Sequence, residues 1–280
     1  MECRSAASSR TRRGKMGTAH VQFQVLGPVE ITKGICPITP RPAKIRSLLA
    51  LLCVKSGTVV PRDFIINALW SGNPPRTART ALQVYVSKLR KHLEAHAGLA
   101  ARLVSRPPGY VLELETSELD LLAFELQVSL AKSTAAAGRT NEALEYWRTA
   151  CDLWRGPALA DLRGLPAFEN FARHLDEKRI DALEQRIAME LQLGRHAGII
   201  SELRGLVAEY PLWEDVHSQL MLSLYRSGRV SESLHTYHKV RDALVRELGL
   251  EPGARIKRLH QSILVRDPDL DAAPALSRAG

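Results

Sequence analysis

The first recognisable pattern in the chain is a strict alternation of apolar and polar residues. Val21-Gln-Phe-Gln-Val-Leu alternates in the manner of a half-buried strand, and Gly27-Pro28 then turns the chain. Two more short apolar segments, residues 29–32 and 35–39, flank Lys33-Gly34 as the strands of a hairpin would. The pattern therefore predicts a small antiparallel sheet over residues 21–39.

The apolar period then becomes that of helices with one buried face. We expect a first helix after Pro42, ending before Gly57. A second helix is expected over residues 62–70, with four inward side chains: Phe64, Ile65, Ala68 and Leu69. A third is expected over residues 76–93, with one apolar stripe: Leu82, Val86, Leu89 and Leu93.

The opposite face of the third helix is polar and basic, with one small apolar residue. Its guanidinium, ammonium, amide and hydroxyl groups are those that contact base edges and phosphates in the major groove of DNA. An ordinary solvated helix face would carry similar groups, so this face alone does not establish DNA binding. The candidate DNA-binding residues on and beside it are Arg76, Arg79, Thr80, Gln83, Val84, Ser87, Lys88, Arg90 and Lys91.

A second hairpin is expected after the third helix, because two short alternating segments flank Arg106-Pro-Pro-Gly109. Three helices followed by such a hairpin make a winged helix, in which the hairpin is the wing. We expect Arg106 to contact the DNA backbone or a narrow minor groove from this wing. Tyr110 is expected to pack at the base of the hairpin.

From Ser117 onward the pattern is wholly helical. Ser117-Glu-Leu-Asp120 has the spacing of a capping box, with Asp in place of Glu. A Gly-Arg turn precedes a similar apolar helix face three times, at residues 138–139, 194–195 and 228–229. The last two turns lie 34 residues apart, the tetratricopeptide period, and the first two lie 56 apart, which leaves room for an extra helix around 166–192. Stacked helical hairpins of this kind usually present a surface to another protein.

Composition supports two unlike halves in the 280-residue chain. The net charge is +9, but residues 1–116 carry +12 and residues 117–280 carry −3. A basic module joined to a near-neutral one indicates that one half binds an anionic polymer, although a basic surface can also serve solubility. No apolar run approaches the ~20 residues of a membrane span, and no secretory signal is evident.

These patterns predict a mostly α fold with a small β component: a winged helix-turn-helix followed by a tetratricopeptide-like all-helical domain. We expect four parts: a disordered basic tail, a DNA-binding domain, a helical-repeat domain and a second tail, over residues 1–20, 21–116, 117–267 and 268–280. Either Met1 or Met16 can be the start. A fragment ending near Thr116 should fold and bind DNA, provided that its core does not rest on the following helices.

Catalytic and cofactor motifs are absent from the sequence. There is no phosphate-binding loop, no GxGxxG, no HExxH and no nucleophile elbow, and the four cysteines are too scattered for a zinc site or a disulfide framework. His92 and His96, at positions i and i+4, are interpreted as solvated side chains. The tryptophans are interpreted as core residues. We therefore expect no enzyme activity, no cofactor and no bound metal.

Six segments resemble a known family. Three lie in the first half: Val25-Leu-Gly-Pro-Val-Glu-Ile, Ala81-Leu-Gln-Val-Tyr-Val-Ser-Lys-Leu-Arg90 and Leu103-Val-Ser-Arg-Pro-Pro-Gly-Tyr110. These resemble the OmpR-type winged helix of the Streptomyces antibiotic regulatory proteins. Three more resemble that family's bacterial transcriptional activation domain: Trp154-Arg-Gly-Pro-Ala-Leu-Ala-Asp161, Leu220-Met-Leu-Ser-Leu-Tyr-Arg-Ser-Gly-Arg229 and Glu247-Leu-Gly-Leu-Glu-Pro-Gly253. The likeness covers about residues 21–267.

The resemblance implies a transcriptional activator of a secondary-metabolite gene cluster. Such activators bind double-stranded DNA at direct repeats near the −35 element, which implies a head-to-tail pair on DNA. They contact RNA polymerase through its sigma factor and the C-terminal domain of its α-subunit. The expected location is the cytoplasm, at the nucleoid. The alternative is a helical-repeat adaptor whose basic module binds RNA or an acidic protein, which would show no DNA sequence preference.

Overall fold

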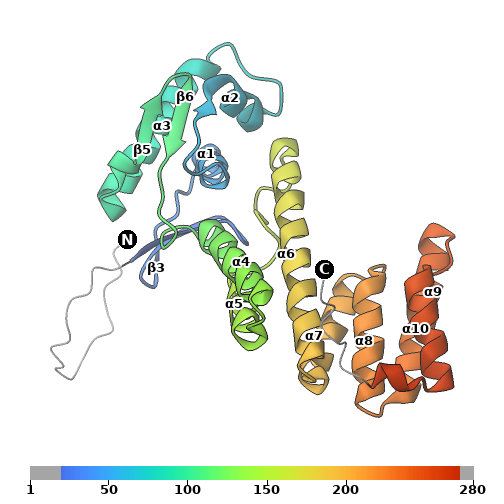
Figure 1. Cartoon of the computed structure of the whole chain (residues 1–280). Coiled ribbons are helices and arrows are strands. Elements are labelled where there is room, and N and C mark those ends of the chain that lie inside the picture. The colour runs from blue at the N-terminus through green and yellow to red at the C-terminus, as the bar shows by residue number, and fades with distance from the viewer. Residues whose placement is uncertain (1–19, 272–280) are drawn as a thin grey trace, which may run out of the picture.

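The structure, a computed structural model, describes residues 20–271 and shows a winged helix-turn-helix followed by stacked helices (Figure 1). The strands are β1 (Val21–Gln24), β2 (Glu30–Lys33), β3 (Cys36–Pro37), β4 (Val60–Pro61), β5 (Leu103–Arg106) and β6 (Gly109–Leu112). The helices of the first half are α1 (Ala43–Val54), α2 (Arg62–Trp70), α3 (Ala78–Ala97) and the 3-10 helix η1 (Ala100–Arg102). Those that follow are α4 (Asp120–Ala136), α5 (Thr140–Asp152), α6 (Pro166–Gln192), α7 (His196–Glu209), α8 (Glu214–Arg226), α9 (Val230–Leu248), α10 (Ala254–Val265) and the 3-10 helix η2 (Pro268–Leu270). The predicted fold class is confirmed.

Both predicted hairpins form. The first sheet is antiparallel in the order β1-β2-β3, with Phe23 opposite Ile31. The second has the order β4-β6-β5, so the wing hairpin gains a third strand from the segment before α2, which the sequence pattern did not reveal. Gly109 makes this pairing possible, because a Cβ atom there would lie 1.8 Å from the carbonyl oxygen of Val60.

The apolar stripe of α3 is buried as predicted, and α2 spans the predicted residues. Phe64, however, was expected to be buried within the winged helix and is 44% exposed, whereas Ile66 is buried. The Phe64 ring lies edge-on to Phe171 of α6, with 6.4 Å between the ring centroids. Phe64 therefore faces the second half of the chain, a neighbour that helical periodicity alone cannot indicate.

The three Gly-Arg turns share one geometry, as the sequence repeat predicts. Gly138, Gly194 and Gly228 have φ angles of 76°, 72° and 74°, in the left-handed region that favours glycine. After each glycine, the arginine N–H donates to the carbonyl of the residue five positions earlier, as from Arg139 to Thr134. The turns therefore join three helical hairpins, α4–α5, α6–α7 and α8–α9, and the long α6 fills the wider first interval.

The hydrophobic core does not stop at residue 116. One cluster of buried residues extends from Phe23 to Ala182 and joins the winged helix to α4, α5 and the first half of α6. Two smaller clusters, which begin with Leu183 and Met221, hold the remaining helices together. The winged helix and the first helical hairpin are therefore one packed body.

Asp120 connects the two halves, and the predicted capping box is wrong. α4 begins at Asp120 itself, and Ser117 lies in the preceding turn. The Asp120 carboxylate accepts hydrogen bonds from the backbone N–H groups of Val25 and Leu26, each at 2.9 Å. A contact between residues almost a hundred positions apart thus replaces the local cap that the spacing indicated.

The irregular segment between α5 and α6 makes a second connection. The Arg155 N–H donates to the Leu26 carbonyl at 2.8 Å, so this segment continues the backbone pairing beyond β1. The Asp161 carboxylate accepts from the Val29 N–H at 2.9 Å and pairs with the Arg46 guanidinium of α1 at 2.7 Å. The end of β1, the turn after it and α1 are therefore all held by the second half of the chain.

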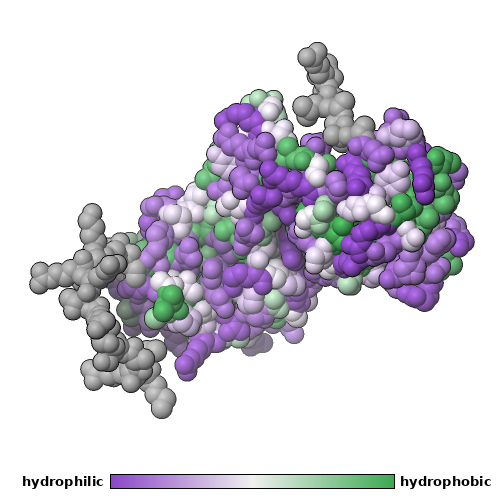
Figure 2. Space-filling view, turned by 90° about the horizontal axis from the view of Figure 1, so that it is seen from below, coloured by the Kyte–Doolittle hydropathy of each residue, from purple (hydrophilic) through white to green (hydrophobic). Residues whose placement is uncertain are grey.

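Exposed apolar side chains gather at the end of the array formed by α9 and α10, where Figure 2 shows green surface. They are Val245, Leu248, Leu250, Leu264 and Val265.

The first expected tail, except His20, and residues 272–280 of the second expected tail lie outside the residues that the structure describes. Within the second tail, the Leu270 carbonyl accepts a hydrogen bond from the Arg226 guanidinium at 2.7 Å. No helix in residues 20–271 is both long and apolar enough to cross a bilayer.

Burial makes Asp120 a pH-sensitive element of stability. Desolvation raises the pKa of its carboxyl from 3.8 to about 6, although hydrogen bonds from Leu26 and Val25 oppose the shift. Between about pH 4 and pH 6, the Asp120 carboxyl is therefore protonated in the folded state but ionised in the unfolded state. Proton binding stabilises the folded state fully below pH 4, and this stabilisation is lost as the pH rises through 6.

We predict that Asp120→Asn removes this pH dependence, because the amide does not titrate. Urea unfolding of both proteins between pH 4.5 and 7.5 measures the effect. As the pH rises from 4.5 to 7, the free energy of unfolding of the wild type should fall relative to the variant by roughly 2 kcal/mol, and the difference should then stay constant. A difference that is the same at every pH would contradict the assignment.

The shared core predicts that a fragment ending at Thr116 does not fold on its own. Removing α4 to α6 exposes buried residues of the winged helix and leaves the Val25 and Leu26 N–H groups without their acceptor. Circular dichroism during heating should show no cooperative transition for residues 1–116. A fragment of residues 1–193 is the control, since it retains the whole first cluster and should unfold cooperatively. A cooperative transition in the shorter fragment would show that its core is self-sufficient.

Candidate nucleic-acid interface

The polar face of α3 lies on the surface of the winged helix. Seven of the residues predicted there are exposed: Arg79, Thr80, Gln83, Val84, Ser87, Lys88 and Lys91. Arg76 is also exposed and lies two residues before the helix begins. Val84, 44% exposed, is an apolar side chain among polar ones, which suits contact with a thymine methyl group. The structure therefore brings the predicted α3 residues onto one accessible surface.

Most of the positive charges on this surface have no acidic partner. Arg76, Lys88 and Lys91 make no ion pair with any residue between 20 and 271. Arg79 contacts Asp63 of α2 at 3.4 Å, but both side chains are more than three-quarters exposed, so this pair is weak. These cations remain available to phosphate groups.

Arg90 differs from its neighbours on α3 because it is half-buried. Its Nε donates to the Leu103 carbonyl at 2.9 Å, and its Nη2 donates to Ser105 Oγ at 2.9 Å. Both acceptors belong to β5, the first strand of the wing hairpin. Arg90 thus fixes the wing relative to α3, a positioning role that the sequence analysis did not foresee.

The wing presents Arg106 at the end of β5. Its guanidinium is 57% exposed and pairs with Glu113 at 2.9 Å. Tyr110 is 4% exposed, which confirms its predicted packing, but it lies opposite Ser105 close to the turn and not at the base of the hairpin. The guanidinium of Arg62, the first residue of α2, lies 5.7 Å from the Tyr110 ring centroid and adds an exposed positive charge beside the wing. Sequence reasoning missed Arg62 because its proximity to the wing depends on the pairing of β4 with β6.

The histidine pair on α3 does not form a metal site with its neighbours. The rings of His92 and His96 stack with 4.3 Å between centroids, and each ring hydrogen-bonds to a backbone carbonyl, of Ile38 and His92 respectively. In the described part of the chain, no three His, Cys, Asp or Glu side chains are placed to share a metal ion.

Comparison with known proteins matches both halves in the predicted order. Residues 40–112 match the family described as transcriptional regulatory protein, C terminal, and residues 119–264 match the bacterial transcriptional activator domain. The regulatory protein DnrI of Streptomyces peucetius is 37% identical over 90% of this chain and 94% of its own length. The regulatory protein AfsR of Streptomyces coelicolor is 38% identical over 91% of this chain.

A solved structure also resembles the chain throughout its folded part. Mycobacterium tuberculosis EmbR, in complex with a low-affinity phosphopeptide, superimposes with a TM-score of 0.81 and 34% identity over 90% of this chain and 68% of that one. The chain spans 26% of the length of AfsR. The combination of an OmpR-type winged helix with a bacterial transcriptional activator domain, shared with DnrI and AfsR, shows that this chain is a transcriptional regulator of the Streptomyces antibiotic regulatory protein family.

Proposed function

We propose that this protein is a sequence-specific DNA-binding activator whose α3 enters the major groove. The observation that carries the proposal is the exposed face of α3, on which amide, hydroxyl and methyl groups lie among cations that, apart from Arg79, have no acidic partner within residues 20–271. Amide and methyl groups distinguish bases, whereas the cations bind phosphates and fix the position of the helix on the duplex.

The wing contributes a second contact, to the DNA backbone or the minor groove. Arg106 projects from the same sheet that Arg90 ties to α3, so the wing and the helix meet DNA in a fixed relation. Positive side chains are favoured in narrow minor grooves, where the electrostatic potential is most negative. The wing then recognises the shape of the DNA while α3 recognises its bases.

We further propose that the helical half recruits RNA polymerase, through the sigma factor and the C-terminal domain of the α-subunit. Two copies bind head-to-tail at direct repeats near the −35 element of a secondary-metabolite gene cluster, and the protein resides at the nucleoid. The relatives named regulatory proteins in Streptomyces support this proposal. So does the exposed apolar surface on α9 and α10, because contiguous apolar patches mark contacts with other proteins.

Footprinting on the promoters beside the gene tests the proposal directly. The expected result is protection of a direct repeat near a −35 element, and stimulation of run-off transcription by purified polymerase from that promoter. Binding to RNA or to unrelated DNA with equal affinity would instead favour the adaptor function.

Two substitutions on α3 should have different effects. We predict that Gln83→Ala costs ~1–3 kcal/mol on the specific site and nothing on unrelated DNA, because an amide reads a base. Lys91→Ala should weaken binding to both DNAs and lower the salt slope of the affinity by about one, because an ammonium meets a phosphate. Fluorescence anisotropy across a salt series measures both, with the exposed Lys257→Ala of α10 as control. If neither α3 variant differs from that control, α3 is not the helix that reads DNA.

We predict that Arg106→Ala reduces DNA affinity without unfolding the protein, since the guanidinium is largely exposed. The matched control is Glu113→Gln, which breaks the same ion pair but leaves the positive charge, and it should bind at least as tightly as the wild type. The measurement is made at 0.15 M salt, where charges act over ~8 Å. Unchanged affinity of Arg106→Ala under these conditions would remove the wing from the DNA contact.

A further inference from the structure

Arg62, the first residue of α2, is held against the wing by backbone contacts. Its N–H donates to the Pro108 carbonyl in the wing turn at 3.3 Å, and the preceding residue, Pro61, pairs with Gly109 of β6. Figure 1 shows α2 directly beside β6. The Arg62 side chain therefore starts from a fixed position relative to the wing.

The Arg62 guanidinium lies on the side of the wing sheet that faces α3. Ser105 points toward α3, because its Oγ accepts a hydrogen bond from Arg90 at 2.9 Å. Tyr110 is directly opposite Ser105 in the ladder, so the two side chains share one face of the sheet. The Arg62 guanidinium lies 5.7 Å from the Tyr110 ring centroid and is therefore on that same side. Arg106, the residue after Ser105, projects from the opposite face.

The Tyr110 ring restrains the Arg62 side chain without neutralising its charge. A guanidinium within ~6 Å of an aromatic centroid is attracted to the face of the ring. The ring itself is fixed by packing, since Tyr110 is 4% exposed. A side chain that is already restrained loses less conformational freedom when it binds a partner. The contact with Tyr110 therefore prepares Arg62 for an anion.

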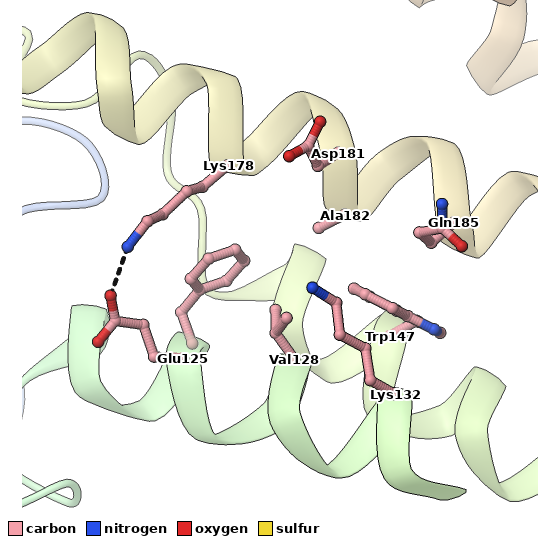
Figure 3. A pocket seen from close by; sticks show the side chains of 9 residues that line it. Glu125, Val128, Lys132, Trp147, Lys178, Asp181, Ala182 and Gln185 are labelled. Carbon is pink, nitrogen blue, oxygen red and sulfur yellow. Dashed lines mark hydrogen bonds and ion pairs between the residues drawn. The ribbon is translucent and has the colours of Figure 1, made fainter. Parts of the chain in front are cut away.

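The charge of Arg62 is free, unlike that of most cations in the helical half. At the cavity between α4, α5 and α6, for example, Lys178 pairs with Glu125 at 2.5 Å (Figure 3). Arg62 is exposed and makes no ion pair with any residue from 20 to 271. It therefore offers an unpaired guanidinium on the α3 side of the wing.

A duplex with α3 in its major groove and the wing at its minor groove passes one strand between them. A single sugar-phosphate backbone separates a major groove from the minor groove beside it, so the helix and the hairpin enclose that backbone. Arg62 lies on the α3 side of the wing, beside the path of this strand, whereas Arg106 projects from the other side.

We propose that Arg62 binds a phosphate of the strand between α3 and the wing, and that Tyr110 positions its guanidinium. This inference rests on the DNA-binding function proposed for the chain. Arg106 contacts DNA from the outer face of the wing and Arg62 from the inner face, so the two arginines fix the wing on the duplex from both sides. Tyr110 itself does not touch DNA.

Fluorescence anisotropy of the full-length protein tests the phosphate contact. The probe is a labelled duplex of about 30 base pairs and mixed sequence, because phosphate contacts do not depend on sequence. Arg62→Ala should weaken binding roughly fivefold and lower the salt slope of the affinity by about one. Arg62→Lys should keep the slope of the wild type, since it keeps the charge. Arg258→Ala is the matched control, because Arg258 is an exposed arginine of α10 without an ion pair in residues 20–271.

The role of Tyr110 is tested with variants that keep its shape, because the side chain is buried. Tyr110→Phe retains the ring and should bind DNA as the wild type does. A phenylalanine fluorinated on its ring, placed at the same position, has less negative charge on the ring face and should bind roughly two- to fivefold more weakly than Tyr110→Phe. This loss should disappear in the Arg62→Ala background. An equal loss in both backgrounds overturns the positioning role.

Lys91→Ala on the same duplex separates this inference from the function on which it rests. If Lys91→Ala lowers the salt slope and Arg62→Ala does not, α3 binds DNA and the Arg62 contact is wrong. If neither variant differs from Arg258→Ala, both the Arg62 contact and the proposed DNA-binding surface are wrong.

Discussion

The arrangement of the two halves depends on the hydrogen bonds that the Asp120 carboxylate accepts. Asp120 is the first residue of α4, and its carboxylate accepts from the consecutive N–H groups of Val25 and Leu26, which directly follow β1. The segment before α4 pairs with this edge of the first sheet, since the Phe23 N–H donates to the Glu118 carbonyl at 2.7 Å, and Asp120 continues the pairing. Desolvation of the carboxylate opposes its ionisation, and the raised pKa is the direct sign of that cost. The contact is retained because it satisfies buried backbone donors that otherwise have no acceptor.

Two of the segments that carry the family resemblance contact each other in the structure. Val25 to Ile31 forms the turn after β1 and the start of β2, and Trp154 to Asp161 forms the irregular segment after α5. Backbone hydrogen bonds join the two segments, and the Arg155 guanidinium pairs with Glu30 at 2.8 Å. These two segments therefore form a joint between the halves. The joint fixes the orientation of the winged helix on the helical array.

Local patterns predicted what local interactions determine. The stripe on α3, the bounds of α2 and α6 and the repeated Gly-Arg turns follow from helical periodicity and glycine conformation, and all are confirmed. Phe64, the role of Asp120 and strand β4 were misjudged or missed, because each depends on a partner far away in the sequence. The same limit applies to the candidate interface: the exposed face of α3 was predictable, but the tie from Arg90 to the wing was not.

The shared core changes how DNA binding and activation can be separated. A cut at Thr116 passes through the first hydrophobic cluster. If a fragment of residues 1–116 fails to bind DNA, the cause is therefore its unfolding, and the result does not locate the DNA interface. Surface substitutions do not have this ambiguity, since Gln83 and Lys91 are exposed and far from Asp120 in the sequence. The packing also means that α6 contacts both α2 of the winged helix and the later helices α7 and α8. Any partner that shifts α6 must therefore either carry α2 with it, through Phe171 and Phe64, or break that contact.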